Sequence, residues 1–336
     1  MRRRVEEHAC ARAGLLGNPS DGYGGKAIAF SLTNFRARAV IEPAEDFALV
    51  PGPSEGLHFT SLRDALAHLD AVGCEDGLRL QRAALRRFAL HADEAGIELG
   101  DGDALRFRLS YDTDIPRQVG LAGSSAIVIA TLRALMAWFE LAIAPETLAE
   151  LALLAEREEL SIAAGAMDRV AQAYRGLLLM DLREPRGPNS YRRLDPALLP
   201  PLLMAWNPRG GTSSGRPHGD LRARWLSGDP DVLAAIERFR ELVDQGVACL
   251  EGRDDEGLRG LVDRNFELRT SIFTVSQDDR EAARLMRSHG AAAKLCGSGG
   301  ALLALPERAS DIADLERDLV RAGWSCARPR VEPPQA

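Results

Sequence analysis

A run of glycine and serine lies between a strand-like segment and a helix-like segment. Upstream, residues 105–110 alternate apolar and polar side chains as a half-buried strand does, and downstream Ile127, Thr131 and Leu135 recur at helical spacing. The run therefore ends at a predicted helix N-terminus, where free backbone N–H groups and the helix dipole favour an anion. The candidate phosphate-binding residues are Gly120, Leu121, Ala122, Gly123, Ser124, Ser125 and Ala126.

The spacing of this loop excludes two familiar phosphate-binding motifs. No Gly-Lys-Ser/Thr follows the glycines, as a Walker loop requires, and the Gly-x-Gly-x-x-Gly fingerprint of a dinucleotide-binding fold is missing from the loop. A nicotinamide-dependent dehydrogenase is therefore not expected. Because a plain turn with a helix cap has the same composition, the assignment depends on other parts of the chain.

Residues 116–126, Pro-Arg-Gln-Val-Gly-Leu-Ala-Gly-Ser-Ser-Ala, resemble the ATP-binding motif of the GHMP kinases, the family of galactokinase, homoserine kinase and mevalonate kinase. Two further segments match that family in the same order. Residues 11–25 resemble its substrate-binding first motif, and residues 294–301 resemble its glycine-rich third motif. The likeness is strongest to the plant glucuronokinase branch, which residues 17–21, 109–118, 163–172 and 218–225 resemble. Asn18-Pro19, where ordinary sugar kinases of the family carry Glu-His, favours this branch over galactokinase.

The resemblance implies an α+β protein with the two-lobed GHMP kinase fold. We expect an N-terminal domain over residues 1–185, with the ATP and sugar sites, and a ferredoxin-like α/β C-terminal domain over residues 186–336. The resemblance also implies ATP and Mg²⁺, with transfer of the γ-phosphoryl group to the anomeric hydroxyl of D-glucuronate. Galacturonate, galactose and arabinose stay open as alternative sugars, and a catalytically silent sugar sensor on the kinase fold stays open as another class.

Phosphoryl transfer needs electrostatic positioning more than covalent chemistry, so a proton acceptor and a cation are sought first. Asp168 matches the family's catalytic aspartate and follows the small residues 163–166. Without that match, an aspartate next to Arg169 is more commonly a surface ion pair or a helix cap. Arg12 matches the first-motif arginine that lies near the transferred phosphoryl group, and its apolar neighbours indicate a charge that is paired or directed into a site.

Magnesium prefers hard oxygen ligands, and the resemblance implies a glutamate about three turns before the catalytic aspartate. Glu156 is the predicted metal ligand, and Glu159, nearly one turn further on, is the alternative. The hydroxyl ligand comes from Ser124 or Ser125, of which Ser125 is assigned.

The resemblance further implies a set of residues that contact the sugar. These are Asn18 and Asp21 in the first motif and Gly297, Ser298 and Gly299 in the third. A uronic acid also carries a carboxylate, for which a planar arginine fork is the best partner. The sequence does not rank the candidate arginines, which are Arg117, Arg169, Arg209, Arg222 and Arg224.

Composition is typical of a cytoplasmic enzyme. The 336 residues carry a formal net charge of −7, which argues against a nucleic-acid or anionic-membrane surface. No apolar run reaches the ~18 residues of a membrane span. We expect small-molecule substrates, no nucleic-acid or membrane partner, and a monomer or homodimer. The cysteines, odd in number and without a Cys-x-x-Cys pair, indicate free thiols, with a packing role for Cys296.

Hydrophobic periodicity predicts the elements that position these residues. Strands are expected over residues 27–32, 37–41, 176–182, 202–206 and 301–305, and helices over 60–70, 77–96, 231–250, 254–274, 279–288 and 309–322, with another that begins at Pro145. Residues 43–58 are predicted as loop, and the polar residues 207–220 as a binding loop or lid. The proline-rich tail, residues 329–336, is expected to fray.

Overall fold

The computed structural model describes residues 3–51, 57–72, 78–100, 102–184, 190–210 and 215–333. The chain forms two compact units, and it enters each of them more than once. The first unit comprises residues 1–10, 35–115 and 123–173, and the second comprises residues 11–34, 116–122 and 174–336. The domain boundary expected at residue 185 stays a prediction.

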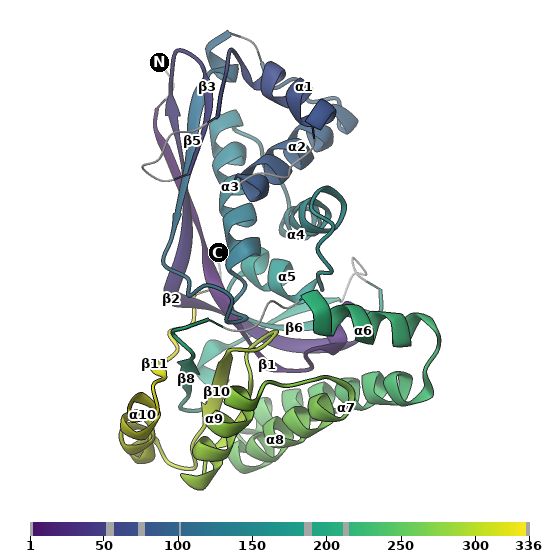
Figure 1. Cartoon of the computed structure of the whole chain (residues 1–336), viewed down its shortest axis with the longest axis vertical. Helices are drawn as coiled ribbons and strands as arrows, with labels where there is room; N and C mark the ends of the chain where they lie inside the picture. Colours follow the sequence, from purple (N-terminus) through teal and green to yellow (C-terminus); the bar gives the residue numbers. More distant parts are fainter. Residues whose placement is uncertain are drawn as a thin grey trace. The chain divides into compact units, whose positions relative to one another are not determined.

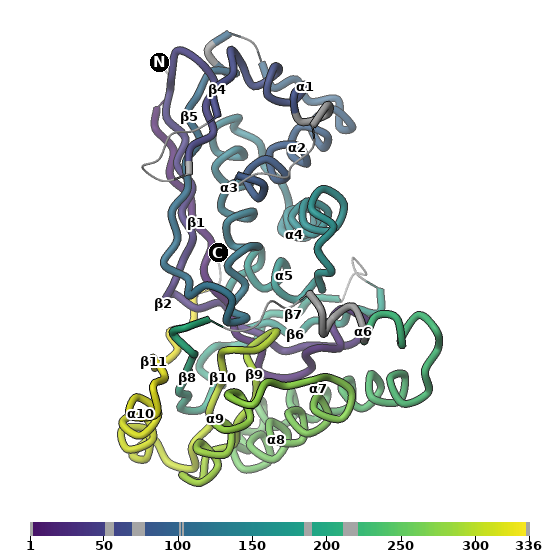
Figure 2. The backbone as a smooth tube through the Cα atoms, viewed as in Figure 1, coloured from purple at the N-terminus to yellow at the C-terminus, as the bar shows by residue number. Residues whose placement is uncertain are grey.

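The first unit consists of a layer of strands with its helices on one side (Figure 1). Its strands are ordered β4-β3-β5-β2, and β1 runs beside β2 (Figure 2). Pairing of β2 with β5 is antiparallel, and pairing of β3 with β5 is parallel. The strands are β1 (Val5–Leu16), β2 (Lys26–Pro43), β3 (Phe47–Pro51), β4 (Leu57–Phe59) and β5 (Phe107–Thr113), of which β1 and β2 continue into the second unit.

Helix α3 (Gly123–Phe139) is the central helix of the first unit. Twelve of its 17 residues are buried, which is typical of a helix that is apolar on all sides. Pro145 opens α4 at a first-turn position, where a missing N–H costs nothing. The other helical elements are α1 (Leu62–Val72), α2 (Arg79–Glu94), α4 (Pro145–Leu154), a π-helical turn (Ala155–Glu159) and α5 (Met167–Tyr174).

The second unit contains a four-stranded antiparallel sheet in the order β11-β8-β10-β9. In addition, β6 pairs antiparallel with the first half of β2, and β7 pairs antiparallel with β6. Its strands are β6 (Leu177–Asp181), β7 (Tyr191–Leu194), β8 (Leu203–Trp206), β9 (Ala292–Leu295), β10 (Ala301–Leu305) and β11 (Ser325–Ala327).

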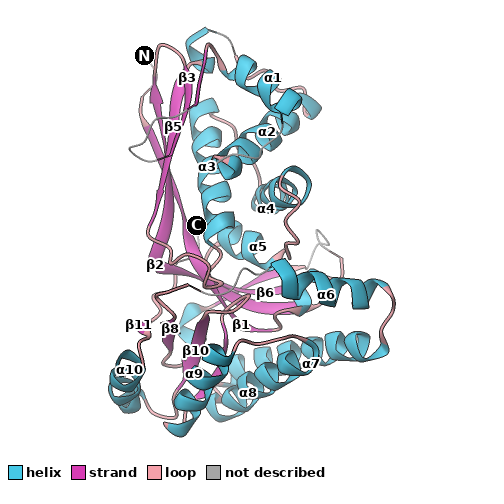
Figure 3. Cartoon of the chain, in the orientation of Figure 1, coloured by secondary structure: helices cyan, strands magenta, loops and turns pink. Residues whose placement is uncertain are grey.

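Two long neighbouring helices, α7 (Pro230–Gly252) and α8 (Asp255–Ile272), are joined by a tight turn (Figure 3). Arg253 ends α7 in the left-handed conformation, with a φ of 54°, and the side chain of Asp254 caps α8 at the N–H of Gly257. The other helices of this unit are α6 (Gly215–Leu226), α9 (Gln277–Ser288) and α10 (Ile312–Arg321).

The structure confirms most of the expected elements and differs from the predicted strands and helices in four places. The two strands predicted on either side of Thr33 and Asn34 form one strand, β2, and the predicted loop 43–58 contains β3 and β4. Strand β1 was not predicted. Within the predicted loop 207–220, α6 begins at Gly215, and residues 211–214 lie outside the described residues.

The C-terminal segment is held in place over its described part, contrary to the expected fraying. The N–H of Thr33 donates to the carbonyl of Arg330 at 2.8 Å, and that of Glu332 donates to Ser31 at 2.9 Å. The Asn34 side chain also bonds the backbone of Arg328 and Arg330. Thr33 and Asn34 do not break the strand because their hydrogen-bonding groups are satisfied by this segment.

Two expectations from composition concern the cysteines and the membrane. The cysteines that the structure describes, at positions 10, 249, 296 and 326, form no disulfide, and Cys74 lies outside the described residues. Among the described helices, none combines the length and the apolar character that crossing a bilayer requires.

An aromatic cluster around Phe107 stabilises the first unit. Phe107 is fully buried, and its ring meets those of Phe47 at 4.9 Å, edge to face, and Trp138 at 5.3 Å. We expect Phe107→Ala to lower the free energy of unfolding by about 3–5 kcal/mol and Phe107→Leu by less than ~1.5 kcal/mol, because only the first leaves a large cavity. Urea denaturation followed by circular dichroism measures both, and equal losses would contradict the cluster's role.

Candidate active site

The second and third glycine motifs meet backbone to backbone within the second unit. A methyl group on Gly120 would lie 2.8 Å from the nitrogen of Ser298, and one on Gly297 would lie 2.2 Å from the carbonyl oxygen of Gly120. Gly120 also has a φ of 71°, which favours glycine. Any side chain at these two positions would push the loops apart.

The Gly/Ser loop leads directly into α3, as the sequence predicts. Ala122, the residue before the helix, has a φ of 63°, a left-handed conformation that costs a non-glycine residue energy. Such strain is common where a backbone must present its groups to a ligand. The helix then begins at Gly123, so the loop ends at a helix N-terminus, a position that suits a phosphate.

Arg12, on β1, joins the three motifs. Its side chain is buried, and Nη1 donates to the carbonyl oxygens of Gly120, at 2.7 Å, and Cys296, at 3.3 Å. Its backbone N–H donates to the carbonyl of Leu121. The guanidinium of Arg12 is thus hydrogen-bonded to both glycine loops, which is compatible with its predicted role near a phosphoryl group.

Two more buried cations lie under the third motif, and sequence reasoning missed both. Arg269, on α8, donates to the carbonyl oxygens of Gly297 at 2.9 Å and Ser298 at 3.0 Å. Lys294, on β9, donates through Nζ to the Gly14 carbonyl at 2.7 Å and to Asn18 Oδ1 at 2.6 Å. A charge inside the otherwise apolar strand β9 was the available signal for Lys294, whereas Arg269 lies in an ordinary amphipathic helix.

The carboxylate of Asp279 holds the far end of the third motif. Both of its oxygens accept from the N–H of Gly300, at 3.1 and 3.2 Å, and sequence reasoning did not find it. Burial raises the pKa of Asp279, although the positive charge of Arg269 opposes this. The glycine loop is therefore held between a buried cation at Gly297 and a buried carboxylate at Gly300.

The buried cations affect one another. Burial, together with repulsion from Arg12, lowers the pKa of Arg269 to about 10, and burial lowers that of Lys294 to about 7, with further lowering by Arg269 and Arg12. Burial raises the pKa of the Cys296 thiol to about 11, so a thiolate is disfavoured and the packing role fits. The guanidinium groups of Arg12 and Arg269, with the partly protonated ammonium of Lys294, favour an anion at this glycine loop.

The turn of the first motif is fixed by Asn18 and by Asn265 of α8. Asn18 Nδ2 donates to the carbonyls of Leu295 and Gly297, and Asn265 Oδ1 accepts a hydrogen bond from the N–H of Gly17 at 2.7 Å. Since its amide is used within the protein, Asn18 shapes the turn, and its predicted contact with the sugar stays a prediction. Asp21 follows in a 3-10 turn and is half-buried.

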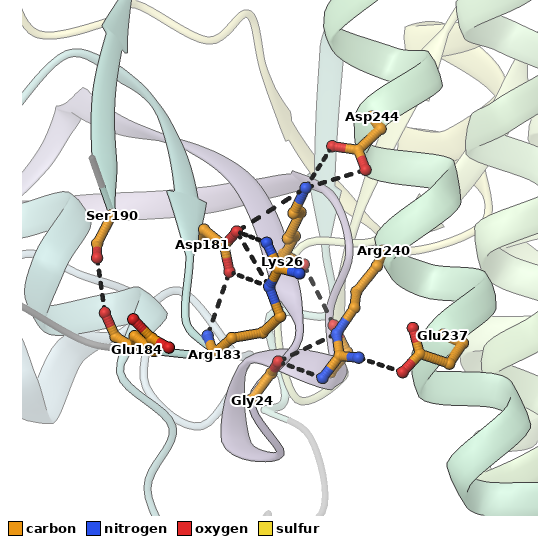
Figure 4. Close-up of polar contacts among 10 residues, drawn as sticks. Gly24, Lys26, Asp181, Arg183, Glu184, Ser190, Glu237, Arg240 and Asp244 are labelled. Atoms are coloured by element: carbon orange, nitrogen blue, oxygen red, sulfur yellow. Dashed lines mark hydrogen bonds and ion pairs between the residues drawn. The ribbon is translucent and has the colours of Figure 1, made fainter. Parts of the chain in front are cut away.

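Charged side chains anchor the end of this turn from outside (Figure 4). Arg240, on α7, donates to the carbonyl of Gly24 at 2.7 and 3.2 Å. The Lys26 ammonium pairs with Asp244 at 2.7 Å and with Asp181 at 3.8 Å. The backbone on the C-terminal side of Asp21 is thereby tied to α7 and β6.

The first unit brings together the predicted catalytic Asp168 and the predicted metal ligand Glu156, whereas Arg12 belongs to the second unit. Ser124 Oγ donates to Glu156 Oε1 at 2.8 Å, and Arg169 pairs with Glu156 Oε2. Arg169 also lies 3.4 Å from Asp168 Oδ2, in the first turn of α5, so one guanidinium serves both carboxylates. Of the two serines, Ser124 is exposed and meets Glu156, whereas Ser125 is fully buried.

Glu159, the alternative metal ligand, is used elsewhere. Its carboxylate pairs with Arg86 at 2.8 Å and with Arg87 at 2.6 Å. Glu156 and Glu159 lie in the π-helical turn, a feature that often marks functional sites. Because this turn alters the helical spacing, the sequence alone did not separate the two glutamates.

The candidate arginines differ sharply in their contacts. Arg169 is committed to Glu156, and Arg224 pairs with Asp229 at 2.8 Å. The side chain of Arg209 is 82% exposed and lies 3.8 Å from Asp278. Arg117 and Arg222 are exposed, and neither forms an ion pair with a described residue.

Comparison with known proteins gives matches along nearly the whole chain. Residues 80–176 match the model of the GHMP kinases N terminal domain. The chain is 39% identical to Probable glucuronokinase 2 of Arabidopsis thaliana over 333 residues, which cover 95% of this chain and 89% of that protein. It is 37% identical to Glucuronokinase 1 of the same plant over 342 residues, 98% and 92% of the two chains.

A solved structure extends the likeness to the fold. Streptococcus pneumoniae phosphomevalonate kinase, in complex with phosphomevalonate and AMPPNP, matches 96% of this chain and 99% of its own, with a TM-score of 0.76. At 16% sequence identity this likeness shows the fold alone.

The buried ammonium of Lys294 gives a prediction about pH. Its pKa is about 7 in the folded protein and near 10.5 when solvated, so above pH 7 the unfolded chain holds a proton that the folded chain has lost. Stability should therefore rise from pH 7 to pH 8, by at most ~1.4 kcal/mol per pH unit. Lys294→Met should flatten this slope.

Denaturant titrations at pH 7.0, 7.5 and 8.0 measure the slope. The window ends at pH 8 because the raised thiol pKa values of Cys296 and Cys326 have the opposite effect at higher pH, where the thiols of the unfolded chain lose their protons. Equal slopes for the two proteins would show that Lys294 does not titrate in this range.

Proposed function

Since this chain belongs to the GHMP kinase family and is one of its glucuronokinase-like members, we propose that it transfers the γ-phosphoryl group of ATP to the anomeric hydroxyl of D-glucuronate. The observation that carries the proposal is the identity of 39% to a protein named as a glucuronokinase, over 95% of this chain. The product is glucuronate 1-phosphate.

The Gly/Ser loop is the proposed phosphate-binding element. Residues 120–126 combine Gly120, where any side chain would clash, with Ala122 in a strained conformation and the first turn of α3. These features suit the phosphates of ATP, because backbone N–H groups can approach them closely. AMPPNP bound to the phosphomevalonate kinase neighbour agrees with a nucleotide substrate.

Asp168 is the proposed acceptor of the proton from the sugar hydroxyl. Its side chain is 19% exposed, and the guanidinium of Arg169, 3.4 Å away, stabilises its negative charge. Arg12 is the proposed cation for the transferred phosphoryl group, supported by its place under both glycine loops.

Ser124 and Glu156 are the proposed holders of Mg²⁺. A hydroxyl and a carboxylate oxygen 2.8 Å apart form the hard-oxygen pair that this ion prefers, so the residues fit it. We prefer Ser124 to Ser125 because only Ser124 is exposed and meets Glu156. When bound, the ion supplies positive charge to the phosphate oxygens.

The function is tested by coupling ADP release to a panel of sugars, namely glucuronate, galacturonate, galactose, arabinose and glucose. We expect the highest kcat/KM with glucuronate. Asp168→Asn should keep the fold and the ATP affinity but lose turnover by ~10²- to 10⁴-fold, because it removes the proton acceptor without changing volume.

The matched control is Asp231→Asn, which changes an exposed aspartate in the first turn of α7. Turnover of Asp168→Asn near that of the unmodified enzyme would refute the catalytic role. Sugar binding without ADP release from any sugar would favour the sensor over the kinase.

The metal site is tested by the Mg²⁺ dependence of the rate. Ser124→Ala combined with Glu156→Gln should raise the Mg²⁺ concentration for half-maximal rate by ~10- to 100-fold, because both oxygen ligands are lost. Glu159→Gln should leave it unchanged, since Glu159 is held by Arg86 and Arg87. A shift with Ser125→Ala and none with Ser124→Ala would return the assignment to Ser125.

A further inference from the structure

We propose that Arg222, on α6, binds the carboxylate of the uronic acid and thereby selects it over the neutral hexose. This inference rests on the proposed glucuronate kinase activity and names the residue on which the choice of substrate depends.

The first argument is the availability of the guanidinium. The described contacts commit Arg169 to Glu156 and Arg224 to Asp229, so neither can turn to a substrate without breaking a pair. Arg209 is directed toward Asp278. Arg222 is exposed and has no such ion pair among the described residues, so its fork is available for a carboxylate.

The second argument is the position of Arg222 beside the sugar-binding turn. The rings of Tyr23 and Trp225 lie 5.6 Å apart at an angle of 54°, which packs α6 against the turn that carries Asp21. Arg222 precedes Trp225 by three residues, so the two side chains are neighbours on the helix surface. Arg117, the other exposed candidate without an ion pair among the described residues, has no ring contact of this kind with the turn in the described part of the chain.

The electrostatics of Tyr23 support this placement. Burial raises the pKa of Tyr23 to about 12; the carboxylate of Asp21 also raises it, and the positive charge of Arg222 lowers it. The phenol therefore lies within reach of both charges. A sugar whose hydroxyl groups bind Asp21 would therefore lie near Arg222 on the neighbouring helix α6.

The third argument is that the turn is anchored while Arg222 is not. Arg240 holds the carbonyl of Gly24, and Lys26 is paired with Asp244, so the backbone beside Asp21 and Tyr23 is fixed from α7 (Figure 4). A fixed turn gives the sugar one orientation. An arginine on the adjacent helix can then distinguish the substituent at C6.

Arg222→Leu removes the fork and keeps an apolar stem of similar length. We expect kcat/KM for glucuronate to fall by ~10- to 100-fold, the range for a hydrogen bond to a charged group, while kcat/KM for glucose changes little. The loss should lie mainly in KM, because the carboxylate is remote from the reacting oxygen. Arg222→Lys keeps the charge and loses the planar fork, so its kcat/KM for glucuronate should lie between those of the unmodified enzyme and Arg222→Leu.

Arg238→Leu is the matched control, since Arg238 is an exposed arginine of α7 without an ion pair among the described residues. It should leave both kcat/KM values unchanged. Thermal unfolding of each variant shows whether the fold is kept, and calorimetric titration with glucuronate alone measures binding separately from turnover.

The outcomes separate this inference from the function on which it rests. If the unmodified enzyme prefers glucuronate and Arg222→Leu keeps that preference, the role of Arg222 is refuted and the kinase assignment stands. If the unmodified enzyme does not use glucuronate, the proposed substrate and the role of Arg222 fall together. Loss of the preference in Arg222→Leu, but not in Arg238→Leu, supports the inference.

Discussion

The hydrogen bonds of the Arg12 guanidinium under the glycine loops are the constraint on which the second unit's site depends. Residues from three distant parts of the sequence meet there, because Arg12 from β1 bonds the carbonyls of both Gly120 and Cys296. A buried guanidinium is unfavourable unless its donors are satisfied, so the loops must present carbonyl oxygens to it. That requirement brings the two backbones together and leaves no room for a side chain at Gly120 or Gly297.

Arg269 and Lys294 extend this arrangement. Each donates to backbone carbonyls of the glycine motifs, so the loops direct C=O groups inward to the buried cations. The cost of burying these cationic side chains is partly offset by these bonds and by the nearby Asp279. Removing one partner from such a cluster is costly, because the remaining groups stay buried and unpaired.

In the first unit, an arginine stabilises two neighbouring carboxylates. Arg169 is held by Glu156 and lies near Asp168, so it keeps two carboxylates close together that would otherwise repel each other. The π-helical turn places Glu156 opposite Ser124 and directs Glu159 to Arg86 and Arg87. Two glutamates three residues apart thus have separate partners.

The sequence by itself determined the family, the order of the three motifs and most of the helices, because glycine spacing and hydrophobic periodicity are local properties. It did not determine β1, the continuity of β2 or the start of α6, since pairing partners distant in sequence decide those elements. Only the tertiary structure separated Glu156 from Glu159, paired Ser124 with Glu156, and found Arg269 and Asp279. Each of these depends on which groups are buried together, and burial is determined by contacts between segments that are distant in the sequence.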